Sequence, residues 1–135
     1  MINILMLPER VLYFTIGSDL TDDEVRQYLA AFSEALQPPT PFSCVFHYVS
    51  GQPRKSKLAH RLENAWLKTH KPELARWCQG IAMIPSPGVM GAIQRIVLKG
   101  FGRKLFGCEC YVAKDPTGAQ QWVTAQLADA TKTVH

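Results

Sequence analysis

Apolar residues in this chain follow two patterns, which alternate along the sequence. Short apolar runs rich in β-branched and aromatic residues predict strands, and stretches with apolar residues three or four positions apart predict helices. The predicted strands are residues 3–7, 11–16, 42–49 and 81–84, and a run ending at Val112. The predicted helices are residues 21–36, 56–69, 88–105 and 116–127. The order is therefore ββαβαβαβα.

Local signals set several boundaries. Thr21 and Glu24 have the spacing of a capping box, in which a hydroxyl and a carboxylate satisfy free N–H groups at a helix start. Asp115-Pro116 predicts another helix start. We expect Pro72 to begin a second, shorter helical piece over 73–78, and Gly80 to release the chain into the next strand.

Strands that alternate with helices favour an α/β fold with right-handed crossovers. We predict a single-layer mixed, mostly parallel five-stranded sheet with four helices. The 135 residues suit one domain over 1–135, with a tail at 129–135 that we expect to be frayed.

The composition, 47% hydrophobic and 19% charged, is that of a soluble globular protein. No apolar run reaches the roughly 18 residues of a membrane span, and the opening residues do not form a signal sequence, so we expect a cytoplasmic protein without a transmembrane segment. The cysteines lack zinc-ligand spacing and are expected to be small buried residues; they are Cys44, Cys78, Cys108 and Cys110.

Positive charge is concentrated in the middle of the chain. Residues 54–104 hold eleven basic and two acidic side chains, whereas residues 1–53 hold two and six. The basic residues form two groups, one just before and on the helix predicted over 56–69 and one on the helix predicted over 88–105. The two groups could merge into one basic patch: Arg54, Lys55, Lys57, Arg61, Arg95, Lys99, Arg103 and Lys104. An acidic protein is the partner we expect. Nucleic-acid phosphates and anionic lipid headgroups are the alternatives, and a solvated face that keeps the protein soluble explains the charge equally well.

The start of the basic helix offers a second way to hold phosphate. Gly88-Val89-Met90-Gly91 resembles the GxxG loop of KH domains, which clamps single-stranded nucleic acid. The resemblance implies phosphate contacts at Gly88 and Gly91. However, a strand and two prolines precede this loop where a KH domain has a helix, and Val89 and Met90 are apolar. Close packing of a helix start on the sheet explains the glycines as well.

The order of elements, with the closing run Tyr111-Val112-Ala113-Lys114-Asp115-Pro116-Thr117-Gly118-Ala119-Gln120-Gln121-Trp122-Val123, resembles the SpoIIAA-like branch of the STAS domains. The resemblance covers about residues 3–127 and implies a regulatory or interaction module that is not an enzyme. It also implies a switch serine after the third strand. The nearest match is Ser50, although Val49 stands where that motif has an acid, and an ordinary turn serine is the plainer interpretation.

The remaining polar residues do not form a catalytic pattern. We expect His47 to be hydrogen-bonded in the core and His60 and His70 to lie on the surface. We identify no catalytic residue, metal site or cofactor in the sequence. The tryptophans are typical of core or interface positions, and they could also line an apolar pocket that holds a lipid-like molecule; they are Trp66, Trp77 and Trp122. The sequence leaves the oligomeric state open, with a homodimer among the alternatives.

Overall fold

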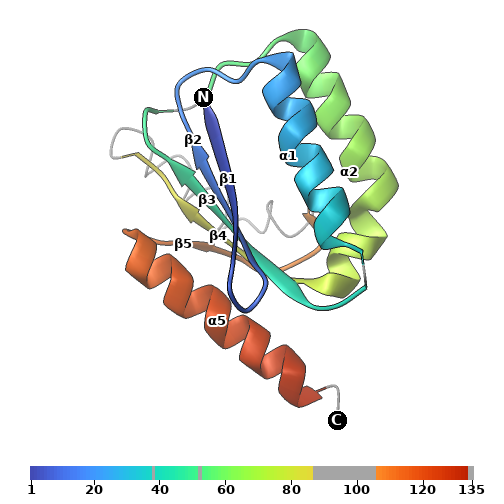
Figure 1. Ribbon diagram of the computed structural model, residues 1–135, viewed down its shortest axis with the longest axis vertical. Helices are drawn as coiled ribbons and strands as arrows, with labels where there is room; N and C mark the ends of the chain where they lie inside the picture. Colours follow the sequence, from blue (N-terminus) through green and yellow to red (C-terminus); the bar gives the residue numbers. More distant parts are fainter. Residues whose placement is uncertain (38, 52, 87–105, 134–135) are drawn as a thin grey trace.

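The computed structural model describes residues 1–37, 39–51, 53–86 and 106–133, with side chains up to Asp129. The described part contains five strands and three helices (Figure 1). In chain order they are β1 Ile2–Leu7, β2 Val11–Ile16, α1 Asp22–Ala35, β3 Phe42–Tyr48, α2 Lys57–Trp77, β4 Cys78–Ile84, β5 Cys110–Val112 and α5 Pro116–Thr133.

The strands form one mixed sheet whose spatial order, β1-β2-β3-β4-β5, is the order of the chain. The β1–β2 hairpin is antiparallel, and β2–β3, β3–β4 and β4–β5 are parallel. The hairpin turn places Glu9 and Arg10 at positive φ, 67° and 63°. The Arg10 guanidinium holds this turn by donating to Ala35 O at 2.7 Å and to Pro41 O at 3.2 Å.

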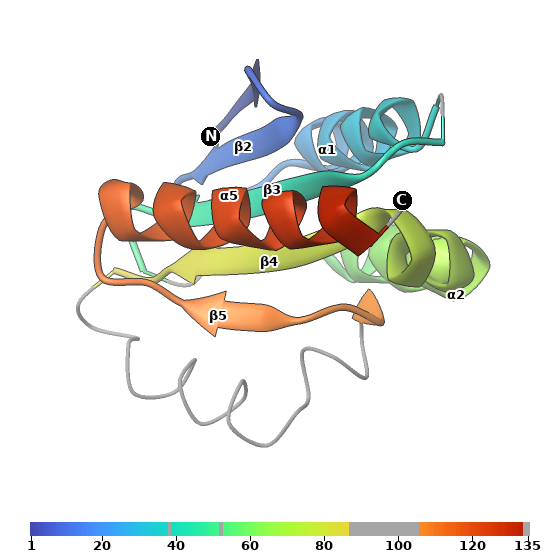
Figure 2. The ribbon, with the colours of Figure 1, turned by 90° about the horizontal axis from the view of Figure 1, so that it is seen from below.

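Helices cover both faces of the sheet. Helices α1 and α2 lie side by side on one face, and α5 crosses the other face over β3 and β4 (Figure 2). Each face has its own apolar cluster: Phe14, Phe32 and Phe46 belong to the α1/α2 side, and Val45 and Val123 to the α5 side. The α1/α2 side carries the aromatic residues that shape the candidate site.

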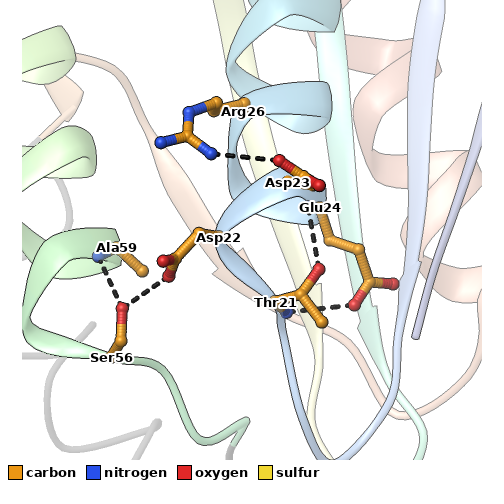
Figure 3. Close-up of polar contacts among 7 residues, drawn as sticks. All are labelled: Thr21, Asp22, Asp23, Glu24, Arg26, Ser56 and Ala59. Carbon is orange, nitrogen blue, oxygen red and sulfur yellow. Dashed lines mark hydrogen bonds and ion pairs between the residues drawn. The ribbon is translucent and has the colours of Figure 1, made fainter.

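The starts of α1 and α2 are tied together (Figure 3). The predicted capping box is present, since the Glu24 N–H donates to Thr21 Oγ1 at 3.1 Å and the Thr21 N–H donates to Glu24 Oε1 at 3.0 Å. Ser56 caps α2 by accepting the Ala59 N–H at 3.0 Å, and its hydroxyl donates to Asp22 on α1. These bonds fix the end of α2 that carries the candidate site relative to α1.

Three boundaries differ from the sequence prediction. Pro72 does not begin a new helical piece, because α2 is continuous from Lys57 to Trp77 with Pro72 inside it. Pro72 is exposed, so water can satisfy the carbonyl that loses its N–H donor, while the fully buried Leu74 anchors the last turns.

Gly80 lies inside β4, which begins directly after α2 at Cys78. Helix α5 continues to Thr133, past the expected start of fraying at Asp129. The third predicted helix, over 88–105, lies outside the described residues, as do Gly88 and Gly91.

Candidate functional site

A cavity of about 280 Å³ lies between the α1/α2 pair and the sheet, over β2 and β3. Its described walls combine aliphatic side chains, aromatic rings and a few polar groups. The aliphatic lining is Ile16, Leu20, Leu29 and Leu67; the rings are Tyr28, Phe32, Phe46, Tyr48, Trp66 and Phe106; the polar lining includes Lys55, His60, Glu63 and Asn64. A concave, mainly apolar space with a few convergent polar groups is typical of small-molecule sites.

The rings form a continuous wall because consecutive elements contribute neighbouring rings. Phe32 of α1 lies 6.0 Å from Phe46 of β3 and 5.5 Å from Trp66 of α2, measured between ring centroids. Trp66 is oriented by its indole N–H, which donates to Ser33 Oγ at 3.0 Å. His70 stacks on the same indole at 4.3 Å. This wall is therefore preorganised by packing and by a satisfied indole N–H.

The polar groups converge on Glu63, whose side chain is 17% exposed. The Lys55 ammonium lies 2.8 Å from Glu63 Oε1, and the Tyr28 hydroxyl donates to Glu63 Oε2. Burial raises the pKa of Glu63 from 4.5 to about 7 and lowers the pKa of Lys55. Water is withheld from both charges, and the carboxyl is poised between its two protonation states near neutral pH.

This arrangement can hold a small molecule with an apolar body and one polar group. The rings and aliphatic side chains exclude water from the body, and Glu63 can accept a hydrogen bond as a carboxylate or donate one as an acid. Tyr28 and Lys55 fix the orientation of that carboxyl. The contacts orient one polar group toward an apolar space, an arrangement that suits the binding of a small molecule.

The structure divides the described half of the basic patch. Arg54 is exposed, but its guanidinium Nε lies 2.9 Å from Asp19 Oδ1. Lys55 points into the cavity wall and pairs with Glu63. Lys57 and Arg61 lie exposed on α2, one helical turn apart. The other half of the patch, Arg95, Lys99, Arg103 and Lys104, lies outside the described residues.

Ser50 lies exposed after β3, in the turn that contains Gly51 at φ +78°. The Gly51 N–H donates to Ser86 Oγ at 2.9 Å, so this turn is attached to the end of β4. A phosphate on Ser50 would find Arg54 and Lys55 already paired with carboxylates. Phosphorylation of Ser50 therefore stays a prediction. Arg54 and Lys55, the two residues expected to bind the phosphate, already pair with Asp19 and Glu63.

His47 and the four cysteines occupy structural positions. His47 is half-buried and its Nδ1 shares a 3.0 Å hydrogen bond with the Tyr13 hydroxyl; burial lowers its pKa. Cys44, Cys78 and Cys108 are buried and none of the four cysteines forms a disulfide. Burial raises the pKa of the Cys44 thiol well above its usual value and that of Cys110 to about 12, which keeps both as unreactive thiols.

Within the described ranges, no group of three or more His, Cys, Asp or Glu could hold a metal ion, and no helix has the length and apolar character needed to cross a membrane.

Sequence reasoning missed Glu63 and Tyr28 as members of the site. A signal was present, because Ala59, Glu63, Trp66 and Leu67 share one helical face at spacings of three and four. A carboxylate on the inward stripe of a helix needs a buried partner. The prediction that a tryptophan lines a pocket holds for Trp66, whereas Trp77 and Trp122 do not line this cavity.

A solved structure from Shewanella loihica PV-4, of an uncharacterized protein from the DUF3478 family with a SpoIIAA-like fold, is similar to this chain with a TM-score of 0.65. The two share 17% sequence identity over 91% of this chain and 92% of that chain. The similarity confirms the predicted SpoIIAA-like fold. No protein-family model and no curated protein matches the chain.

Proposed function

We propose that this chain is a non-enzymatic regulatory module whose signal is a small, largely apolar molecule with one neutral polar group, bound between the sheet and α1/α2. The cavity of about 280 Å³ beneath the Phe32–Phe46–Trp66 wall carries this proposal. The SpoIIAA-like fold supports it, since the resemblance implies a module that acts by binding and not by catalysis.

The polar lining selects the kind of headgroup. When Glu63 is ionised it pairs with Lys55 at 2.8 Å, so an additional negative charge on a ligand would lack a partner in a water-poor space. A hydroxyl can donate to the Glu63 carboxylate or accept from its protonated form, and it matches the carboxyl in either state. A medium-chain alcohol is therefore the simplest probe of this chemistry.

Calorimetric titration with octanol tests the cavity. We expect saturable binding with a negative heat-capacity change, because apolar surface leaves water. Leu67→Trp fills the lined space and should abolish binding, while Leu58→Trp on the exposed side of the same helix should leave it intact. If Leu67→Trp binds octanol like the wild type, or if the wild type does not bind it, the proposed ligand site is wrong. Native mass spectrometry of protein purified from its own cells would identify a bound small molecule.

A separate proposal concerns the macromolecule that the module binds, and Lys57 and Arg61 support it. Their exposed positions one turn apart give α2 a positive surface that neither ion pair neutralises. We propose that this surface binds an acidic protein, with nucleic acid or anionic lipid as the alternatives. K57E/R61E should weaken a salt-sensitive complex with an identified partner, whereas Lys114→Glu, an exposed change on the α5 side, should not. Loss of heparin retention without loss of a protein partner would favour a polyanion instead.

A further inference from the structure

Strand β1 forms one edge of the sheet and carries no charged residue from Ile2 to Leu7 (Figure 2). Its apolar side chains are unusually open, with Leu5 51% and Met6 49% exposed. Folded proteins usually protect a sheet edge with a charge, a proline, a bulge or a very short strand. None of these devices occurs within the six residues of β1.

The pairing with β2 determines which backbone groups face outward. The Gly17 N–H donates to Met1 O at 2.8 Å, and Asn3, Leu5 and Leu7 stand opposite Thr15, Tyr13 and Val11. Hydrogen-bonded residues alternate along an antiparallel pair, so Asn3, Leu5 and Leu7 bond to β2. The N–H and C=O groups of Ile2, Ile4 and Met6 therefore point away from the sheet.

We propose that β1 pairs with β1 of a second copy of this chain, antiparallel and centred on Ile4. Ile4 then faces the partner's Ile4, and Ile2 faces the partner's Met6. This register is self-complementary, because every outward N–H of one copy meets an outward C=O of the other. The two five-stranded sheets become one continuous sheet with both α1/α2 layers on the same side.

The chemistry of the strand favours a second copy as its occupant. The chain carries a net charge of +4, yet β1 is uncharged, so two copies can meet along it without like charges in register. The two-fold register also places Asn3 opposite Leu5 of the partner, in the close, non-hydrogen-bonded type of pair. Both side chains are exposed in one copy, and the pairing covers them.

A pair of charge variants tests the contact and its register together. N3K/L5K places a lysine opposite a lysine at both symmetric pairs and should give a monomer of 15.1 kDa by light scattering after gel filtration. N3E/L5K places opposite charges at the same two pairs and should restore the dimer of twice that mass. Circular dichroism and thermal unfolding of both variants check that the fold is retained.

Amide hydrogen exchange of the wild type gives an independent readout. In the dimer, the amides of Ile2, Ile4 and Met6 should gain protection as protein concentration rises, while Asn3 and Leu5 are protected throughout by β2. A wild type that stays monomeric across the concentration series, or exchanges rapidly at Ile2, Ile4 and Met6, would overturn the proposal. A dimer that survives N3K/L5K would place the interface elsewhere.

Discussion

Glu63→Gln tests the buried carboxyl on which the candidate site depends. The pKa of Glu63 rises from 4.5 to about 7 on folding, because its side chain is 17% exposed and sits beneath the aromatic wall. A rise of this size corresponds to roughly 3 kcal/mol of difference between the two protonation states. Glutamine keeps the size of the side chain and an oxygen for the Tyr28 hydroxyl, but it does not titrate.

The direction follows from proton binding. Between pH 4.5 and 7 the folded protein holds a proton on Glu63 that the unfolded chain releases. The free energy of unfolding therefore falls as pH rises through this window. This contribution is fully present below pH 4.5 and is lost above about pH 7.

Urea unfolding of the wild type and of Glu63→Gln at a series of pH values measures the effect. We expect the wild type to lose up to about 3 kcal/mol across the window relative to the variant, whose curve should be flatter. Glu34→Gln, an exposed change on α1, serves as the control and should follow the wild type. Parallel curves for wild type and Glu63→Gln would show that the carboxyl is not desolvated and would refute the reasoning.

Two further changes test how the site is supported. Thr21→Ala removes one half of the capping box at α1 and should lower the free energy of unfolding in urea by about 1 kcal/mol. Thr117→Ala, an exposed change in the first turn of α5, is the control and should cost less. Equal losses of stability would contradict a capping role for Thr21. Gly80→Ala places a Cβ 2.7 and 2.8 Å from ring carbons of Trp122 and should cost about 1–3 kcal/mol. The smaller ring in G80A/W122F should recover part of that loss, and strictly additive costs would show that the two residues do not meet.

The sequence predicted elements best where local chemistry and tertiary packing agree. The capping box at Thr21 and the apolar stripe of α1 both occur, because short-range signals fix that helix. Prediction was wrong where packing overrode a local signal. Gly80 resembled a helix stop, but the structure needs a residue without a side chain there, since Trp122 lies against β4. Only the fold of α5 onto the sheet creates that requirement.

The candidate site was predictable in kind and not in detail. The sequence indicated a tryptophan-lined pocket, and Trp66 does line the cavity. The sequence also assigned Lys55 to a basic surface, because charge counts treat every lysine as exposed. In the structure, the start of α2 turns Lys55 toward Glu63. Lys55 precedes the Ser56 cap and lies eight residues before Glu63, so their pairing follows no helical periodicity. The sequence alone therefore could not show that Lys55 is partly buried while Lys57 is exposed.

The Lys55–Glu63 pair is easier to understand as part of a binding site than as a source of stability. Removing two charges from water is costly, and well-packed apolar residues of similar volume are often as stabilising or more so. Phe32, Phe46 and Trp66 give such residues an apolar surface to pack against, although the Tyr28 hydroxyl would lose its acceptor on Glu63. A carboxyl whose pKa is raised by burial to about 7 lowers stability at neutral pH. Its value lies in giving an otherwise apolar cavity one oriented polar group that can hydrogen-bond a ligand in either protonation state.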